Sequence, residues 1–223
     1  MVATARYDGL ADWYDENLGP FTAAVADVLR ALLADDEGRC VDLGCGTGVH
    51  LPFLRELGWH VTGVDISADM LRRARGRAAP DCDLVRADLA ALPFPDALFD
   101  AAVSILVHTD VDDYTAVLNE AARVLRPRGR FVHVGLHPCF VGPFSRCRGA
   151  EEPPVLFRGY RDASWTDDGP GFGEGLRRMV GSRHLPLADL LNAMTTAGFR
   201  LERFDEPEGY EFPRVLAVAA TRT

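Results

Sequence analysis

Hydrophobic residues along this chain gather in short runs, and stretches with helical spacing separate one run from the next. The run at 99–110 is almost unbroken in its apolar character, which is typical of a parallel strand covered on both faces. The predicted strands lie at 39–43, 59–65, 83–86, 99–110, 130–135 and 215–220, with a further strand after Gly198. This alternation of helix and strand predicts an α/β domain.

The region before the first strand is predicted to form two helices, at 7–16 and 21–33, separated by Gly19-Pro20. The second helix has its apolar residues on one face, as expected of a helix that packs against the body of a domain. We therefore expect residues 1–35 to cap the domain.

Residues 138–185 interrupt the alternation. The segment contains eight glycines, five prolines and six aromatic residues, and it has no sustained period. An irregular segment of this length inside a compact domain is usually functional or disordered, and the aromatic content argues against simple disorder. We expect it to form a substrate pocket and a lid.

Composition narrows the class of protein. The length of 223 residues suits one domain with a full core, so a single domain over 1–223 is expected. A net charge of −9 disfavours a nucleic-acid partner, because a phosphate backbone needs a positive face. Neither a signal peptide nor a membrane segment is recognisable, and the five cysteines are scattered without zinc spacing. We expect a cytoplasmic protein with no metal site and no membrane partner.

The most informative motif is VDLGCGTG at 41–48, where glycines stand at alternate positions directly after a strand, at Gly44, Gly46 and Gly48. Glycine lacks Cβ, so this loop can adopt positive φ and let a ligand approach the backbone closely. The following helix offers unpaired N–H groups at its first turn. Dinucleotide sites usually show G-x-G-x-x-G, whereas here the spacing is G-x-G-x-G with the acidic Asp42 in the strand.

Two further acidic residues follow predicted strands. Asp65 ends the second strand 21 residues after Gly44, where a carboxylate can accept two O–H bonds from a ribose. The alternative is a cap for the next helix, a role that Ser67 could also fill. Asp88 comes directly after the third strand, and a helix cap is its alternative role too.

Together with EAARVLRPRGRFVHVG at 120–135, these motifs resemble those of class I S-adenosylmethionine-dependent methyltransferases over roughly residues 38–136. The resemblance implies a Rossmann-like sheet of seven mostly parallel strands in the order 3-2-1-4-5-7-6, with the last strand antiparallel and helices on both faces. It implies S-adenosylmethionine as the cofactor and a small-molecule methyl acceptor, methylated on oxygen or nitrogen more readily than on carbon. In the family, an acid placed like Asp88 accepts the adenine amino group.

The segment YDGLADWYD at 7–15 is similar to an N-terminal helix of this family in which a tyrosine covers the cofactor. Tyr7 and Tyr14 can equally be rings that dock the helix on the body. The expected cofactor-binding residues are Tyr14, Asp42, Gly44, Cys45, Gly46, Gly48, Asp65, Ile66, Ala87, Asp88, Leu89, Ser104 and Ile105.

Methyl transfer from a sulfonium is an in-line displacement that needs positioning and desolvation but no covalent nucleophile. A hydroxyl acceptor gains from a general base, and neutral imidazole suits that role. His137, just after the fifth strand, is the first candidate, and His108, after the fourth, is the second. His184 can reach the pocket from the lid. Each can instead be a structural histidine, and an amine or activated carbon acceptor needs no base.

Two other interpretations stay open. A nicotinamide-dependent reductase would share the strand, the glycine loop and the distal acid, but the chain contains no lysine and hence no Tyr-x-x-x-Lys pair. A protein that binds S-adenosylmethionine but catalyses another reaction, or regulates a partner, has the same sequence features. Detection of a methylated product separates this second interpretation from methyl transfer.

Overall fold

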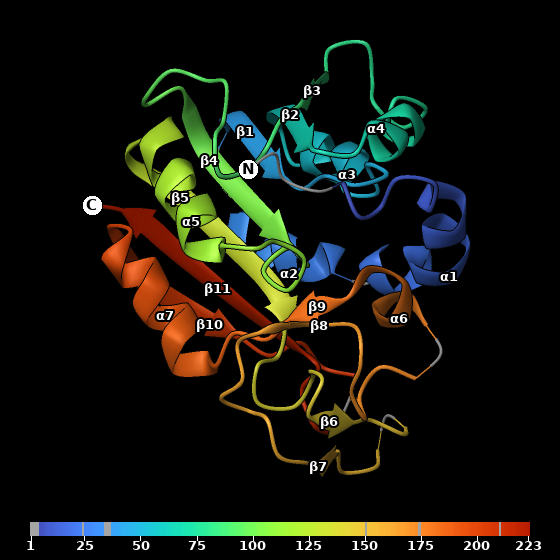
Figure 1. The fold of residues 1–223 in the computed structure, drawn as a ribbon. Helices are drawn as coiled ribbons and strands as arrows, with labels where there is room; N and C mark the ends of the chain where they lie inside the picture. Colours follow the sequence, from blue (N-terminus) through green and yellow to red (C-terminus); the bar gives the residue numbers. More distant parts are fainter. Residues whose placement is uncertain (1–4, 24, 34–36, 150, 174, 210) are drawn as a thin grey trace.

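A computed structural model describes residues 5–23, 25–33, 37–149, 151–173, 175–209 and 211–223. A seven-stranded sheet in the order β3-β2-β1-β4-β5-β11-β10 forms its centre (Figure 1). The strands are β1 (Gly38–Leu43), β2 (Trp59–Asp65), β3 (Asp83–Arg86), β4 (Phe99–Ile105), β5 (Leu125–Leu136), β10 (Phe199–Asp205) and β11 (Val215–Arg222). Only β11 runs antiparallel to its neighbours β5 and β10, so the predicted fold class and strand order are confirmed.

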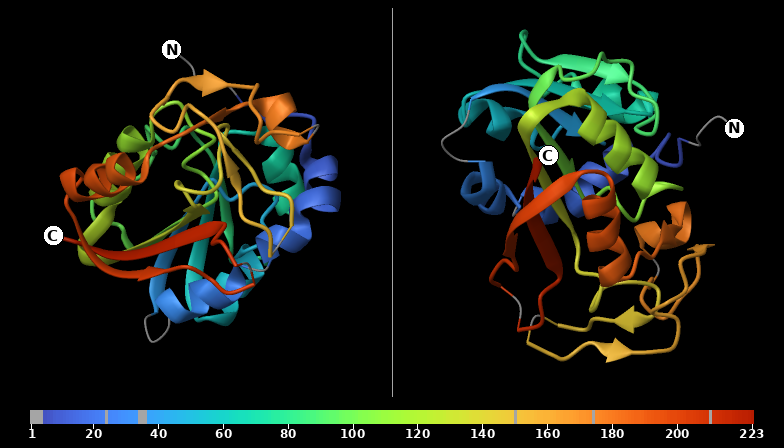
Figure 2. Two further views of the ribbon diagram at one scale, coloured as in Figure 1. Left: turned by 90° about the horizontal axis from the view of Figure 1, so that it is seen from below. Right: turned by 90° about the vertical axis from the view of Figure 1, so that its left-hand side faces the viewer.

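Helices cover both faces of the sheet (Figure 2). They are α1 (Ala11–Ala23), α2 (Ala26–Leu33), α3 (Leu51–Glu56), α4 (Ala68–Ala74), α5 (Tyr114–Val124), α6 (Leu176–Val180) and α7 (Leu187–Thr196). Successive residues of a strand face opposite sides. In β1, Val41 and Leu43 accordingly join the core under α5 and α7, whereas Cys40 joins the core under α2 and α3.

The predicted boundaries of the two N-terminal helices are wrong. Residues 7–9 form a turn, and Gly9 has a φ of +82°, which ends any helical path before Ala11. Helix α1 then continues through Gly19-Pro20 to Ala23, so the predicted break between the two helices at these residues is wrong. Residues 1–4, 24 and 34–35 of the predicted cap lie outside the described residues.

Residues 138–185 contain more regular structure than the sequence pattern predicts. Two short antiparallel strand pairs occur in it, β6 (Ser145–Arg146) with β7 (Val155–Leu156), and β8 (Trp165–Thr166) with β9 (Ser182–Arg183). These strands have two residues each, too short to give a recognisable period. The segment lies at the end of the sheet toward which the arrowheads of β4 and β5 point (Figure 1), and we call it the lid segment. Residues 150 and 174 of this segment are not among those described.

None of the helices in the described part of the chain is long and apolar enough to cross a membrane. Among the same residues, no group of three or more histidine, cysteine, aspartate or glutamate side chains is arranged to hold a metal ion.

Candidate active site

The glycine loop lies where the strand order reverses, between β1 and β4, and this is the usual ligand position in open α/β sheets. All three glycines have positive φ, +76° at Gly44, +52° at Gly46 and +78° at Gly48. A Cβ at Gly44 would stand 2.6 Å from Val107, and one at Gly48 would stand 2.9 Å from Leu51. A Cβ at Gly46 would meet nothing within 4 Å. Two glycines are therefore needed for packing, and Gly46 leaves open space above the loop.

Asp65 joins the glycine loop to the end of β2. Its Oδ2 accepts a hydrogen bond from the backbone N–H of Gly46 at 2.9 Å, and its Oδ1 accepts one from Ser67 N at 2.8 Å. The hydroxyl of Ser67 caps α4 by accepting from Met70 N at 3.1 Å, so Ser67 fills the role proposed as Asp65's alternative. Each carboxylate oxygen of Asp65 keeps a further lone pair for a ligand hydroxyl.

Asp42 is a buried carboxylate directly beneath the loop. Only 1% of the residue is exposed, and Oδ2 has no hydrogen-bond partner among the described residues. Burial, followed by the charge of Asp65, raises the pKa of Asp42 to about 7. A buried, partnerless carboxylate is costly unless a cation or donor arrives. A cationic group or a hydrogen-bond donor of a ligand would therefore stabilise the Asp42 carboxylate.

A small cavity opens beside these residues. It is lined by Tyr14, Asp42, Gly44, Cys45, Gly46, Thr47, Val49, His50, Ile105 and Leu106. Six of them are among the predicted cofactor-binding residues, and Thr47, Val49, His50 and Leu106 are additions from the structure. Leu106 has a φ of +59°, so the chain turns sharply after β4. Sequence spacing gives no signal for such a turn at a leucine.

The segment after β3 is tied to the end of β2, since Ala87 N donates to the carbonyl of Asp65 at 3.1 Å. Asp88 comes next, and its Oδ1 accepts from Ala90 N at 2.9 Å. This contact closes a turn, and no helix follows it. Leu89 is buried in the core below. The predicted cofactor-binding residues Asp65 and Asp88 thus stand on adjacent strand ends.

Ser104 belongs to a buried chain of hydrogen bonds. Its hydroxyl shares a 2.9 Å hydrogen bond with the Tyr114 hydroxyl, which shares one of 2.8 Å with His133 Nδ1. Ser104 does not line the cavity, whereas its neighbour Ile105 does. The cofactor role of Ser104 stays a prediction that this buried chain of hydrogen bonds does not favour.

His108 lies against this chain of hydrogen bonds. A Cβ at Gly135 would stand 2.5 Å from His108 Nδ1 and 2.7 Å from His133 Nε2, so the two rings approach closely only because residue 135 is glycine. Neither of these two nitrogens has a hydrogen-bond partner among the described residues. Burial lowers the pKa of His108 to about 4. The ring is therefore neutral at pH 7 and has a free lone pair or N–H.

His137 occupies a separate place, near the loops that flank β10 and β11. Its Nε2 lies 2.8 Å from Glu206 Oε1, and its Nδ1 accepts from Cys139 N at 3.1 Å. Both ring nitrogens are engaged, so His137 has no free lone pair with which to accept a proton. Among the described residues, no hydrogen bond or ring contact joins His137 to His108.

The N-terminal segment, the loop after β4 and the lid segment meet at Asp110. The Tyr7 hydroxyl donates to Asp110 Oδ1 at 2.7 Å, and Arg177 of α6 pairs with the same carboxylate. Arg177 also donates to Thr109 Oγ1 at 3.1 Å. The rings of Tyr7 and Tyr14 are in edge contact with centroids 6.0 Å apart. Burial, and next the charge of Asp110, raises the pKa of both phenols, so both stay protonated.

A second cavity lies under the lid segment. Its lining comprises Thr109, Leu136, Val141, Gly142, Pro143, Gly171, Phe172, Arg177, Ser182, Arg183 and His184. Of the aromatic residues in the lid segment, Phe172 lines it, while Phe144 packs behind His184 with ring centroids 4.8 Å apart. His184 Nε2 is buried without a hydrogen-bond partner in the described part of the chain. An apolar wall with a few polar groups is the usual composition of a small-molecule pocket.

Known proteins resemble this chain in both sequence and structure. A family model described as a methyltransferase domain matches residues 41–133. The demethylmenaquinone methyltransferase of Tropheryma whipplei (strain Twist) is 40% identical over 109 residues, which cover 48% of this chain and 46% of that protein. The phosphatidylethanolamine N-methyltransferase of Cereibacter sphaeroides is 36% identical over 162 residues, which cover 70% of this chain and 76% of that protein.

The crystal structure of an S-adenosylmethionine-dependent methyltransferase from Mesorhizobium loti superposes with a TM-score of 0.76 at 28% identity, covering 89% of this chain and 98% of that one. The chain spans about half the length of the demethylmenaquinone methyltransferases it matches, between 46% and 61%. The matched region contains the glycine loop, Asp65 and Asp88. The strand order, the glycine loop and these relatives together establish that the chain belongs to the class I S-adenosylmethionine-dependent methyltransferases.

Proposed function

We propose that this protein transfers the methyl group of S-adenosylmethionine to a small-molecule acceptor. One observation carries the proposal: the glycine loop, which is hydrogen-bonded to Asp65, lies above the buried Asp42, whose carboxylate Oδ2 has no hydrogen-bond partner among the described residues. S-adenosylmethionine supplies an electrophilic methyl group on a sulfonium, and its amino-acid end carries an ammonium group. Two carboxylates beside an open backbone loop fit a ligand that is cationic and lacks phosphate.

The predicted roles assign one part of the cofactor to each strand end. Asp42 and the glycine loop would hold the amino-acid end, Asp65 the ribose hydroxyls, and Asp88 with Leu89 N the adenine. Tyr14 lines the same cavity and would cover the cofactor from the side of α1. Tyr14 also lies in ring contact with Tyr7, so the docking role and the covering role are compatible.

The cavity under the lid segment is the proposed acceptor pocket. Its wall carries Arg177 and Thr109, which both contact Asp110. Thr109 follows closely after Ile105 and Leu106, which line the cavity at the glycine loop, so the loop after β4 contributes to both cavities. Transfer forms a bond from the acceptor atom to the methyl carbon while the carbon–sulfur bond breaks. For a hydroxyl acceptor the proton must pass to a base. We assign that role to His108, because His108 Nδ1 has no hydrogen-bond partner in the described part of the chain and both nitrogens of His137 are occupied.

Two general features of the chain support a cytoplasmic location and a small-molecule acceptor. All five cysteines are free thiols, which suits a reducing compartment. The net charge of −9 suits a small acceptor better than a nucleic acid.

The experiment is to measure binding first and turnover second. Calorimetry with S-adenosylhomocysteine should give saturable binding, and NADH should give none. Demethylmenaquinone and phosphatidylethanolamine, the acceptors named for the relatives, begin a panel that includes small phenols and amines. Mass spectrometry should detect a product heavier by one methylene unit. Binding of S-adenosylhomocysteine without any methylated product across the panel would favour a non-methylating role, and binding of NADH alone would overturn the proposal.

A further inference from the structure

Four buried polar side chains lie together where β4, β5 and α5 meet. Ser104 of β4 and His133 of β5 are paired directly in the sheet, and both are fully buried. Tyr114, the first residue of α5, and His108, in the loop after β4, are buried beside them. The reaction proposed above uses only His108. We call the four residues the buried polar cluster.

Short hydrogen bonds connect the cluster from Ser104 to His133. The Tyr114 hydroxyl lies 2.9 Å from the Ser104 hydroxyl and 2.8 Å from His133 Nδ1. Burial raises the pKa of Tyr114, so the phenol keeps its proton. A phenol has one hydrogen, so when it accepts from one of these partners it donates to the other. A hydrogen on His133 Nδ1 therefore makes Tyr114 a donor to Ser104.

The rings of His133 and His108 meet edge to face, with centroids 5.1 Å apart and planes at 68°. His133 Nε2 and His108 Nδ1 lie 2.7 Å and 2.5 Å from the point that a Cβ of residue 135, a glycine, would occupy. Both nitrogens are enclosed, and neither has a hydrogen-bond partner among the described residues. Burial lowers the pKa of both histidines, so each ring is neutral at pH 7 and carries one N–H. Two lone pairs or two N–H groups facing this point would repel, so the stable arrangement directs one N–H toward one lone pair.

We propose that His133 is a positioning residue that sets the tautomer of His108. The inference rests on the proposed function, in which His108 is the general base. Because Nδ1 of His108 is enclosed, an acceptor hydroxyl can reach this ring only at Nε2, which must then carry the lone pair. The hydrogen of the neutral ring is therefore on Nδ1, where it faces the lone pair of His133 Nε2.

The rest of the cluster keeps His133 in the matching state. With its lone pair on Nε2, neutral His133 has its hydrogen on Nδ1 and donates it to the Tyr114 oxygen, and Tyr114 donates to Ser104. When the acceptor hydroxyl passes its proton to Nε2 of His108, that ring becomes an imidazolium whose Nδ1–H faces the same lone pair. A buried positive charge is costly without an acceptor beside it, so the arrangement also stabilises the charged ring.

The test is NMR spectroscopy of the full chain with isotope-labelled histidines, because the ring nitrogen shifts distinguish the two neutral tautomers. His108→Asn identifies the signals of His108 by their loss. In the wild type His108 should be the Nδ1–H tautomer. Tyr114→Phe removes the hydroxyl and keeps the ring, and it should turn His108 into a mixture of the two tautomers. Ser104→Ala removes the last hydroxyl of the cluster and should act in the same direction.

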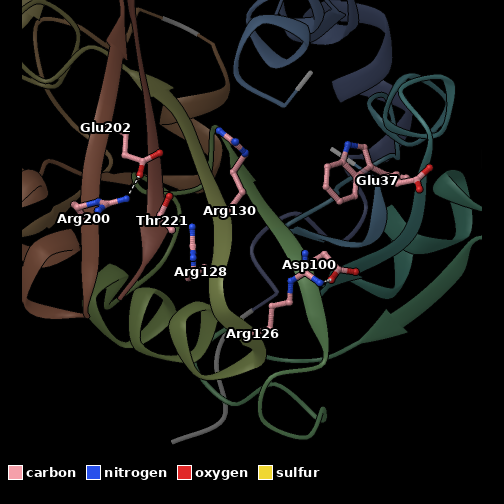
Figure 3. A pocket seen from close by; sticks show the side chains of 9 residues that line it. Glu37, Asp100, Arg126, Arg128, Arg130, Arg200, Glu202 and Thr221 are labelled. Carbon is pink, nitrogen blue, oxygen red and sulfur yellow. Dashed lines mark hydrogen bonds and ion pairs between the residues drawn. The ribbon is translucent and has the colours of Figure 1, made fainter. Parts of the chain in front are cut away.

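Two control variants should leave the tautomer of His108 unchanged. Thr62→Val removes a buried hydroxyl from β2, outside the cluster. Arg128→Gly alters the opposite end of β5, where Figure 3 shows Arg128 beside a separate cavity that contains no residue of the cluster. Glycine also suits the φ of +66° at this position, so this variant should fold.

Kinetics with a hydroxyl acceptor provide the second readout. Tyr114→Phe should lower kcat about 10–100-fold, the usual effect of removing a group that orients an imidazole. KM and the affinity for S-adenosylhomocysteine should stay nearly unchanged. His133→Gln keeps an amide oxygen near the position of Nε2 and should retain more of the rate than His133→Leu does.

The NMR result separates this inference from the proposed function. An Nε2–H tautomer of His108 in the wild type, or an unchanged tautomer in both Tyr114→Phe and Ser104→Ala, would overturn the inference even if the protein methylates an acceptor. The Nδ1–H tautomer in the wild type and its loss in these variants support the positioning role even if no acceptor is methylated, and then only the proposed function fails.

Discussion

The hydroxyl of Tyr7 donates a 2.7 Å hydrogen bond to Asp110 Oδ1, although the two residues lie 103 positions apart in the chain. The same carboxylate pairs with Arg177 from α6. A single acidic side chain therefore connects the segment before α1, the loop after β4 and the lid segment. Thr109 and Arg177, which both contact this carboxylate, line the cavity under the lid segment, so Asp110 holds part of that cavity's wall in place.

Arg177→Met should destabilise the protein much more than Arg178→Met does. Arg177 and Asp110 are 19% and 14% exposed, and breaking a largely buried pair leaves an uncompensated charge that costs about 3–5 kcal/mol. Arg178 and its partner Asp168 are 47% and 76% exposed, and such surface pairs contribute about 0–1 kcal/mol. Chemical denaturation of the two variants measures the difference. Equal losses would mean that the Asp110 pair does not connect the three segments energetically.

Asp42→Asn should make the ligand-free protein more stable than the wild type at pH 8. At pH 4 the gain in stability should be much smaller. Burial raises the pKa of Asp42 to about 7, against about 3.9 in an unfolded chain. The folded state therefore keeps a proton that the unfolded state has lost, and the wild type loses stability as pH rises between these two values. The neutral amide avoids this loss, by roughly 2–4 kcal/mol above pH 7. Denaturation curves of both proteins at the two pH values measure this gain. A gain in stability that does not depend on pH would contradict the raised pKa of Asp42.

Asp65→Ala should lower the affinity for S-adenosylhomocysteine at least about tenfold while the protein stays folded. The change removes acceptors for ligand hydroxyls, each worth about 1.5–3 kcal/mol when the acceptor is charged. It also releases the N–H groups of Gly46 and Ser67. Asp65→Asn retains one acceptor oxygen and should do less harm. Calorimetry compares both with Asp83→Ala, an exposed carboxylate on the adjacent strand. If Asp65→Ala binds S-adenosylhomocysteine as tightly as the wild type, Asp65 does not hold the ribose.

The sheet and the glycine loop could be predicted from the sequence because both depend on local patterns. A strand that ends in alternate glycines specifies its own turn, and the acids at the ends of β2 and β3 then lie beside it through parallel pairing. Contacts between distant segments gave no such pattern. The pairing of Arg177 with Asp110 and the left-handed turn at Leu106 depend on tertiary packing, which no spacing in the sequence reports.

For the same reason, the sequence cannot decide whether His137 or His108 is the better candidate for the general base. Position after a strand placed His137 and His108 at the same edge of the sheet, but it could not show that Glu206 and Cys139 occupy both nitrogens of His137. The glycine at 135 that lets His108 approach His133 is likewise visible only in three dimensions.

His108→Asn should lower kcat for a hydroxyl acceptor by about 10²–10⁴-fold, the usual contribution of a general base. His137→Gln should change kcat little and reduce stability instead, because it breaks the contact with Glu206. The pKa of His108 is lowered to about 4 by burial, so the ring stays neutral and kcat should remain level until the pH falls toward that value. A pH–rate profile with a midpoint near 6.5, or a large loss of rate in His137→Gln, would contradict the role of His108.

Phe172→Ala should raise the acceptor KM and leave the affinity for S-adenosylhomocysteine nearly unchanged. Phe172 is 7% exposed and lines the cavity under the lid segment, whereas none of the described residues of that segment lines the cavity at the glycine loop. Phe157, in the same segment, is 43% exposed, so Phe157→Ala is the matched control and should behave like the wild type. Steady-state kinetics and calorimetry on both variants separate the two sites, with a melting curve to confirm that Phe172→Ala is folded. If Phe172→Ala weakens cofactor and acceptor binding alike, the lid segment does not form a distinct acceptor pocket.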